Sequence, residues 1–458
     1  MRRRVVLTGA AIGLMVMLAG CAAPTVIVSK PRLNVDHALP PGQWGLSLLR
    51  PSQYPNMEAA FMHKAGLLTA IDRSMAYLQS PSSRKFFPDG PITHRQELNT
   101  LYDFRTMLRT FRSPGEFQQA ILQRYDVYTA RGYDDRGSVW FTGYYTPILY
   151  GSLVRTGPYQ YPVYKAPRDL VANPVTGQIL GQRLPNGTIR PYPTRRQIVE
   201  GHLLQGRELV WFSNPLDAYV AEIQGSAKVI LTNHQVMTIG YAGDNGRTYS
   251  GLGVALVKSG AIRRRKLSLP AIESYFHWHP KTVERLILKN HFMAFLKPYN
   301  PAHWPLGSLG VKVTPHRSLA TDKTIEAPPY QSIFPRAAIT FVSTQVPDLT
   351  GHQQPFTGFL LDQDTGGAIR AAGRADIYMG IGPEAENQAG YELSKGRLYY
   401  LFLKPGLTPL GGPGAAPTLP APVNTAPGRG GAPAAAGPST TAPKSSSNAM
   451  QQMFPGAK

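Results

Sequence analysis

One segment, Phe359 to Gly382, constrains the fold of this chain more than any other. It begins with an apolar run, Phe359-Leu360-Leu361, that is typical of a buried strand. A second strand is predicted over residues 374–378. Glycines let the backbone turn tightly and approach a ligand closely, and this segment has five of them: Gly366, Gly367, Gly373, Gly380 and Gly382. The pattern therefore predicts two strands that meet around a glycine-rich turn.

Three carboxylates bracket this turn, with Asp362 and Asp364 before it and Asp376 after it. Acids are scarce in the chain, at 27 Asp plus Glu against 48 Lys plus Arg. Clustered carboxylates raise one another's pKa, so that one can keep its proton near neutral pH. A protonated carboxyl is what acid-catalysed glycoside cleavage needs. Alternatively, Asp362 and Asp364 cap the turn, a position that Asp favours. The segment alone leaves both interpretations open.

The composition favours strands over a helical bundle, with 45 Gly, 42 Pro, 23 Tyr and 17 Phe in 458 residues. The hydrophobic fraction of 42% allows a substantial core, and the length allows two or three domains. The formal charge is +21, which in an intracellular protein would suggest nucleic acid as the first partner. The N-terminus argues against that compartment.

The first 21 residues have the pattern of a bacterial export signal. Arg2-Arg3-Arg4 precede an apolar stretch from Val5 to Leu18, which is too short to span a bilayer comfortably. Leu18-Ala19-Gly20-Cys21 resembles a lipobox, so Cys21, the single cysteine, is the predicted lipidation point. An ordinary signal peptide with a chance cysteine is the alternative. A single cysteine also excludes a disulfide within the chain.

The residues after Cys21 predict the location of the mature protein. Ala22 and Ala23 follow it without an Asp, which indicates an outer-membrane lipoprotein facing the periplasm of a Gram-negative bacterium. Removing Arg2, Arg3 and Arg4 from the charge of +21 leaves about +18. An exported basic protein meets anionic polymers such as cell-wall peptide carboxylates. Residues 22–50 are interpreted as a tether, and residues 406–458, rich in Gly, Pro and Ala without Asp or Glu, as a disordered tail.

Three helices are predicted before the first strand: one near Met57–Leu78, one from Thr93 toward Phe111 with Thr93 and Gln96 in capping-box positions, and one that starts after Ser113. Residues 139–147 are predicted to form a strand broken at Gly143. Its tyrosine rings could stack on sugars and its threonine hydroxyls could bond them. A tyrosine-rich strand edge without such a role is the alternative.

The remaining pattern alternates helices and strands. A helix is predicted after Thr194, with Gln197 at its third position, and two more near Leu252–Lys258 and Thr282–Lys289. The predicted strands are Tyr159–Tyr164, Glu208–Phe212, Ala218–Ile223, Lys228–Leu231, Val236–Tyr241, Gly310–Val313, Ala338–Val342, Thr357–Leu361 and Leu398–Leu403.

Several common chemistries lack their motifs. The chain has no GxSxG, HExxH or P-loop, and lipidation would occupy its only thiol. His277-Trp278-His279 is interpreted as packed or surface residues rather than a metal site, and Arg263 to Lys266 as a solvated loop. Carboxylate acid/base catalysis is the chemistry that remains.

Several motifs, in order, resemble the membrane-bound lytic murein transglycosylase A family over residues 137–404. They are Phe141-Thr-Gly-Tyr-Tyr-Thr-Pro147, Gln224-Gly-Ser226, Tyr241-Ala-Gly243 with Asn245-Gly246, Asp364-Thr-Gly-Gly-Ala-Ile369, and Asp376-Ile-Tyr-Met-Gly380-Ile-Gly-Pro-Glu-Ala385. The resemblance implies a mainly β (α+β) fold with a double-psi β-barrel domain, built from residues 51–147 and 298–405 and including the N-terminal helices. A second β domain, residues 148–297, would be inserted.

The resemblance also assigns site residues. Asp376 matches the family's catalytic aspartate, and Asp364 and Asp322 match the two that accompany it, so Asp362 becomes a strand-end residue. The implied substrate-binding residues are Thr142, Tyr144, Tyr145, Gln224, Gly225, Asn245 and Tyr378. No metal or cofactor is implied. The implied partners are peptidoglycan glycan strands, the outer membrane through the lipid anchor, and cell-wall synthesis or division proteins, without nucleic acid.

The implied reaction uses one acid. Asp376 would donate a proton to the MurNAc–GlcNAc β-1,4 oxygen, and would then take the proton of the MurNAc 6-hydroxyl as that oxygen attacks C1. The product is a 1,6-anhydro-MurNAc end, and no water is consumed. Asp364 and Asp322 would hold Asp376 in place and favour its protonated form. Two alternatives stay open: an inverting hydrolase with Asp364 or Glu384 as second carboxylate, and a non-catalytic wall-binding lipoprotein.

Overall fold

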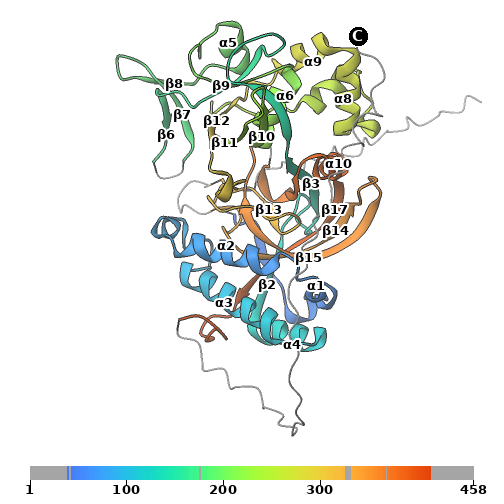
Figure 1. Ribbon diagram of the computed structural model, residues 1–458. Coiled ribbons are helices and arrows are strands. Elements are labelled where there is room, and N and C mark those ends of the chain that lie inside the picture. Colours follow the sequence, from blue (N-terminus) through green and yellow to red (C-terminus); the bar gives the residue numbers. More distant parts are fainter. Residues whose placement is uncertain (1–38, 41–42, 175–176, 325–331, 368, 414–458) are drawn as a thin grey trace, which may run out of the picture. The chain divides into compact units, whose positions relative to one another are not determined.

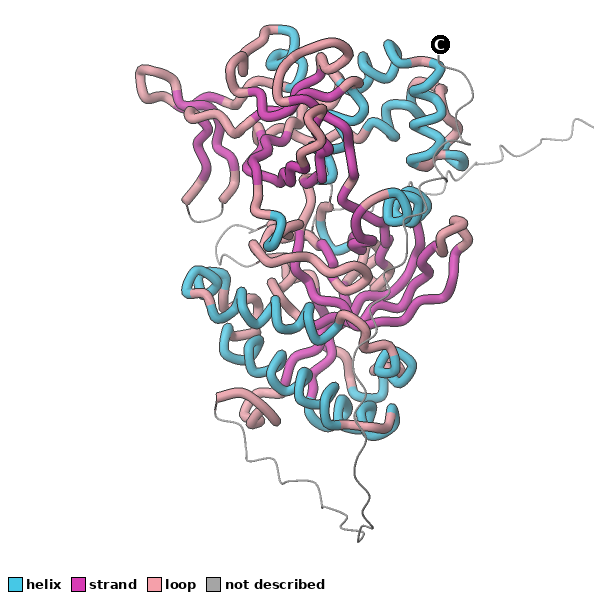
Figure 2. The backbone as a smooth tube through the Cα atoms, in the orientation of Figure 1, coloured by secondary structure: helices cyan, strands magenta, loops and turns pink. Residues whose placement is uncertain are grey.

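The structure is a computed structural model that describes residues 39–40, 43–174, 177–324, 332–367 and 369–413 (Figure 1). The predicted leader, Cys21, most of the predicted tether and nearly all of the predicted tail lie outside the described residues. The described part is a mixed α and β fold with three separate sheets. Figure 2 shows helices and strands alternating along the same backbone.

The largest sheet contains strands from both ends of the described chain. These strands are β1 (Leu46–Leu48), β2 (Tyr125–Ala130), β3 (Val139–Thr146), β13 (Ser318–Ala320), β14 (Ile339–Pro347), β15 (Gln353–Asp364), β16 (Arg374–Ile381) and β17 (Leu393–Leu403). Because β3 pairs with both β16 and β17, the order β17-β14-β15-β13-β16-β3 closes on itself. The β13–β15 and β3–β16 pairs are parallel and the other pairs of this ring are antiparallel. A closed ring of six strands with two parallel pairs is consistent with the expected double-psi barrel.

Four helices pack beside this sheet: α1 (Glu58–Met62), α2 (Leu67–Gln79), α3 (His94–Thr110) and α4 (Pro114–Arg124) (Figure 1). Their apolar faces meet the sheet in an aromatic core, in which the rings of Phe104 and Phe117 lie 4.9 and 5.7 Å from that of Phe359. Such rings bury large apolar areas, so this contact explains why the helices stay on the barrel.

The helix starts mostly follow the predicted caps. Ser113 caps α4, and Thr93 accepts the Gln96 N–H at 3.1 Å. Gln96 does not complete the predicted capping box, because its side chain donates to the Leu403 carbonyl at 2.9 Å and so ties α3 to β17. The single helix predicted over 57–78 is wrong: the chain leaves α1 at Met62 and restarts after Gly66, whose φ of +72° suits glycine.

A second, six-stranded sheet lies in the middle of the chain. Its order is β12 (Ala294–Pro298), β11 (Val236–Asp244), β10 (Ser226–Leu231), β4 (Ile148–Ser152), β9 (Glu208–Phe212) and β5 (Tyr161–Tyr164). A small third sheet contains β6 (Leu170–Ala172), β7 (Ile179–Arg183) and β8 (Ile189–Arg190). The accompanying helices are α5 (Arg195–Glu200), α6 (Pro215–Gln224), α7 (Leu252–Lys258), α8 (Leu269–Trp278) and α9 (Pro280–Ile287). The capping box predicted at Thr194 and Gln197 is confirmed.

Three strand predictions are wrong. Residues 218–223 belong to α6, which starts from an Asn214 cap and Pro215 at the first position, a start signal that outweighs the local apolar run. Residues 310–313 form a loop with one isolated bridge, between Leu306 and Lys312. β3 is not broken at Gly143 and continues to Thr146. Two helices, α8 and α10 (Pro383–Tyr391), were not predicted.

A buried ion pair fixes the interior end of β15. Lys323 donates to Asp362, which also accepts from Thr321 Oγ1 at 2.7 Å and from Tyr400 Oη at 2.6 Å. Both charged side chains are almost fully buried. Asp362 is thus a structural residue close to the end of its strand, in agreement with the prediction for it.

Replacing one partner of this pair should destabilise the fold strongly. In Lys323→Met the Asp362 carboxylate stays buried without its counter-ion, and such losses typically cost about 3–5 kcal/mol. Chemical denaturation should show that decrease in the free energy of unfolding, whereas Lys297→Met, at an exposed strand position, should change it by less than about 1 kcal/mol. Equal effects of the two substitutions would contradict this account.

Candidate active site

The short strand β13 brings the three predicted aspartates together. Its residue Ala320 lies opposite Asp364 of β15 on one side and opposite Asp376 of β16 on the other. Asp322 follows two residues later in the same segment. Asp322 precedes Asp364 by 42 positions and Asp376 by 54, and the insertion of β13 between β15 and β16 brings these segments together.

Asp376 lies at a partly exposed position, with 13% of its side chain accessible. On the neighbouring strand β3, Thr142 is its register partner and donates a hydrogen bond to Oδ1. Arg374, two residues earlier on β16, donates from Nε to Oδ1 at 3.0 Å and from Nη2 to Oδ2 at 3.2 Å. The same guanidinium donates to Thr142 Oγ1 at 3.0 and 3.2 Å. Arg374, Thr142 and Asp376 therefore form one connected polar group.

Asp364 accepts three hydrogen bonds at the end of β15. Oδ2 accepts from Tyr144 Oη at 2.9 Å, and Oδ1 accepts from the backbone N–H groups of Ser308 at 2.7 Å and Thr365 at 2.8 Å. Burial raises the pKa of Asp364 to about 6, and these donors offset part of that increase. Asp364 can therefore change its charge near neutral pH.

Asp322 is buried and bonds only backbone and a neighbouring threonine. Its Oδ2 accepts the Ala371 N–H at 2.6 Å and its Oδ1 accepts the Thr324 N–H at 2.8 Å. Ala371 has a φ of +58°, which is unfavourable for alanine, so this bond holds the loop between Asp364 and Asp376 in a strained form. Asp322 thus shapes the loop that leads into β16.

A fourth carboxyl, from Glu392, lies on the other side of β3. Its Oε1 accepts from Ser394 Oγ at 2.6 Å, while Oε2 is buried without a hydrogen-bond partner among the described residues. Burial, together with the negative charge of Asp376, raises the pKa of Glu392 to about 8, against an opposing effect of Ser394. A Cβ on Gly143 would lie 3.1 Å from the Glu392 Cβ and 2.7 Å from the Ala389 Cα, so glycine is required for this close packing.

The tyrosines predicted to bind substrate differ in exposure. Tyr144 is half-buried, and burial and Asp364 raise the pKa of its phenol well above the ordinary value, so it remains a donor. Tyr378 is buried, stacks obliquely on Tyr144 at 5.1 Å and bonds Thr146 through its hydroxyl. Tyr145 is also buried and donates to Glu386 of α10. Only Tyr144 of the three presents surface beside the aspartates.

Gln224 and Gly225 lie half-buried at the end of α6. The Gln224 side-chain oxygen accepts the Tyr145 N–H at 3.1 Å, and Gly225 ends the helix with a φ of +70°. Gln224 therefore contacts the strand that carries Thr142 and Tyr144. This contact connects the α6 region to the aspartate site.

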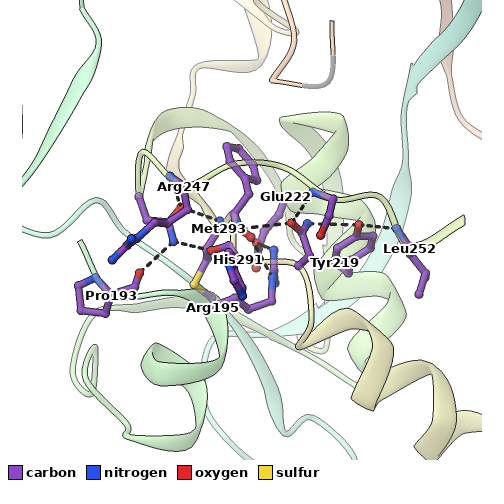
Figure 3. A network of polar contacts seen from close by, with 12 residues as sticks. Pro193, Arg195, Tyr219, Glu222, Arg247, Leu252, His291 and Met293 are labelled. Atoms are coloured by element: carbon purple, nitrogen blue, oxygen red, sulfur yellow. Dashed lines mark hydrogen bonds and ion pairs between the residues drawn. The ribbon is translucent and has the colours of Figure 1, made fainter. Parts of the chain in front are cut away.

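Asn245 is buried in a separate polar network. Its amide donates to the Pro193 and His291 carbonyls at 3.0 and 2.8 Å, and its oxygen accepts the Met293 N–H at 3.0 Å. Figure 3 shows these partners together with the Arg195–Glu222 ion pair. Asn245 uses its hydrogen-bonding capacity on backbone, so in this structure it fixes the chain after β11 rather than presenting an amide to a ligand.

Sequence reasoning missed Arg374 and Glu392. The spacing of Arg374 from Asp376 was a usable signal, since residues two apart on a strand point to the same face. Glu392 reaches the site through the pairing of its neighbour Leu393 with Thr142, which no local pattern reveals. Within the described ranges, no group of three or more His, Cys, Asp or Glu is placed to hold a metal ion, and no helix is both long and apolar enough to cross a membrane.

Comparison with known families identifies the family of this chain. Residues 140–297 match the model of the MltA specific insert domain, and residues 317–402 match that of the 3D domain. Over 289 residues the chain is 30% identical to membrane-bound lytic murein transglycosylase A of Escherichia coli (strain K12), covering 61% of this chain and 70% of the relative. The chain belongs to the lytic murein transglycosylase A family. Its Vibrio cholerae member is 30% identical over 296 residues, which are 62% of this chain and 72% of that protein.

Solved structures of the family share the fold. A membrane-bound lytic murein transglycosylase from Agrobacterium tumefaciens aligns with a TM-score of 0.64 at 23% identity, over 79% of this chain and 98% of that one. The Escherichia coli MltA structure with bound chitohexaose aligns with a TM-score of 0.59 at 25% identity, over 82% and 100% of the two chains. That relative therefore holds a glycan oligomer on the same fold.

Glu392 should make stability depend on pH. Its pKa is raised from 4.5 to about 8 in the folded protein, so its stabilising contribution is present below pH 4.5 and is lost as pH rises through 8. Glu392→Gln should therefore reduce the fall in unfolding free energy between pH 5 and pH 8, by about 1–3 kcal/mol. Urea denaturation at both pH values measures this difference. The control is Glu384→Gln, at an exposed position, whose unfolding free energy should depend on pH as in the wild type. The raised pKa of Glu392 would be refuted if the unfolding free energy of Glu392→Gln fell with pH as much as that of the wild type.

Proposed function

We propose that this chain is a peptidoglycan lytic transglycosylase that cleaves the MurNAc–GlcNAc β-1,4 bond and leaves 1,6-anhydro-MurNAc ends. The observation that carries the proposal is the placement of Asp376, a partly exposed carboxyl that β13 aligns with Asp364 and Asp322 in a chain of this family. The relatives' names assign them the same class of activity. The enzyme is thus a lyase acting on a polysaccharide.

The glycan is proposed to contact the half-buried residues around Asp376. Thr142, Tyr144, Gln224 and Gly225 lie at or beside β3 and retain exposed surface. Tyr145, Tyr378 and Asn245 act behind them as positioning residues, because they are buried and bonded within the protein. The domain division at 51–147 with 298–405, and 148–297 as an insert, agrees with the two separate large sheets.

In the proposed reaction, the Asp376 carboxyl donates its proton to the glycosidic oxygen as the bond to C1 breaks. The resulting carboxylate accepts the proton of the MurNAc 6-hydroxyl, whose oxygen forms the new bond to C1. Thr142, which bonds Asp376, fixes the orientation of the carboxyl through both steps. Asp364 and Asp322 hold the two ends of the intervening loop, so their effect on Asp376 is through position.

The protein is proposed to act as an outer-membrane lipoprotein facing the periplasm, with Cys21 as the lipidated residue. Its relatives are named membrane-bound, and the lipobox supplies an anchor in the sequence. Its positive charge suits a wall whose peptides carry carboxylates.

An inverting hydrolase is the main alternative, and it needs a second carboxylate about 6.5–9.5 Å from the acid to activate water. Glu384 is exposed in the first turn of α10 and has no hydrogen bond to the aspartate site among the described residues. Asp364 is tied by three donors that include two backbone groups. These contacts favour a positioning role for Asp364 over that of a mobile base.

Asp376→Asn tests the assignment of the acid. The amide keeps the size of the side chain and can still bond Thr142, but it has no acidic proton. Turnover of purified murein should fall by at least about a thousandfold, since general acid–base catalysis typically contributes 10² to 10⁴. Sedimentation with insoluble murein should show that binding persists.

Asp72→Asn, on the surface of α2, is the matched control and should digest murein like the wild type. Normal digestion by Asp376→Asn would show that another group is the acid. Binding without digestion by the unaltered protein would favour a wall-binding lipoprotein.

A further inference from the structure

Arg374 forms an ion pair with Asp376, the proposed acid. Its guanidinium places one donor on each oxygen of Asp376, the forked arrangement that suits an ionised carboxylate. This pair stabilises the ionised form of Asp376, which has no proton to donate. Movement of the guanidinium to another acceptor would therefore favour the protonated form that acid catalysis needs.

Arg374 is placed to make that exchange with a ligand. Its side chain is 25% exposed, more than that of Asp376 at 13%, so both side chains are partly accessible to solvent. Arg374 and Asp376 share one face of β16, with Thr142 opposite on β3. A ligand that reaches Asp376 therefore also reaches Arg374.

The surrounding charges favour an anionic acceptor. Among the described residues, Asp376 acts electrostatically on Glu392, which stays protonated at neutral pH, and on the phenol of Tyr144. Near Arg374 lies the phenol Tyr249. A guanidinium that left Asp376 would give up the carboxylate that it now pairs with in a partly buried site. A carboxylate from the substrate would restore the pair.

We propose that Arg374 is a specificity-determining residue that binds a carboxylate of the glycan substrate and thereby releases Asp376 for acid catalysis. This inference rests on the proposed function. Two parts of peptidoglycan supply this chemistry: the lactyl group of a muramyl residue without a peptide, and the acidic residues of the wall peptides. Polymers of N-acetylglucosamine have neither.

The test compares cleavage of matched soluble glycan strands by the wild type and by Arg374→Gln. The substrates are peptide-free strands, the same strands with their lactyl carboxylates converted to methylamides, and peptide-bearing strands with and without amidation of the peptide carboxyls. In the wild type, kcat/KM should fall about tenfold or more when the recognised carboxylate is amidated, as expected for a lost charge-assisted bond. The ratio of kcat/KM on the unmodified strand to kcat/KM on the amidated strand should approach one in Arg374→Gln, whatever the overall rate of this variant.

The two pairs of substrates identify the source of the carboxylate. Amidation should lower wild-type kcat/KM in the peptide-free pair if the lactyl carboxylate is recognised, and in the peptide-bearing pair if a peptide carboxylate is recognised. Arg374→Lys should discriminate between unmodified and amidated strands less than the wild type but more than Arg374→Gln. A lysine retains the positive charge but lacks the two parallel donors of the guanidinium. Thermal melts and murein binding confirm that the variants are folded.

The inference is overturned if amidation leaves wild-type kcat/KM unchanged in both pairs, or if Arg374→Gln keeps the wild-type ratio. Failure of the proposed function looks different, because the wild type would then release no anhydro products from any of these strands.

Discussion

The structure depends on the insertion of β13 between β15 and β16. This three-residue strand places one residue, Ala320, opposite both Asp364 and Asp376. Asp322 follows the strand, and its side chain bonds Ala371 in the loop between Asp364 and Asp376. The β3–β16 pairing then brings Thr142 against Asp376, and closure of the barrel through the β3–β17 pairing brings Glu392 close to it. The arrangement of the site is a consequence of strand order, since Thr142, Asp322, Asp364, Asp376 and Glu392 are all at least 12 positions apart in sequence.

The three aspartates have different surroundings and therefore different uses. Asp322 bonds backbone in the interior, Asp364 accepts three donors and has a pKa raised to about 6, and Asp376 pairs with a partly exposed arginine. Asp376 is the one of the three that pairs with Arg374, the residue proposed to exchange partners when substrate binds. These contacts support the proposed division into one reacting group, Asp376, and two positioning groups, Asp322 and Asp364.

Much of this arrangement could be predicted from local pattern. The strand–turn–strand of residues 359–382 is confirmed because its apolar runs and glycines act over a few residues. The assignment of 218–223 as a strand is wrong because the Asn214-Pro215 helix start, a signal outside the apolar run, decides the segment. The role of Arg374 could have been predicted from its spacing of two residues from Asp376. Glu392 reaches the site through the pairing of Leu393 with Thr142, which are 251 positions apart, and no local pattern contains that information.

The central claim is that the attacking oxygen comes from the sugar itself and not from water. Digestion of purified murein by the protein without residues 1–21, in water enriched in ¹⁸O, tests it most directly. Mass spectrometry of the released ends should show anhydro-muramyl products without ¹⁸O. Reducing ends that carry ¹⁸O would contradict the account and establish hydrolysis instead.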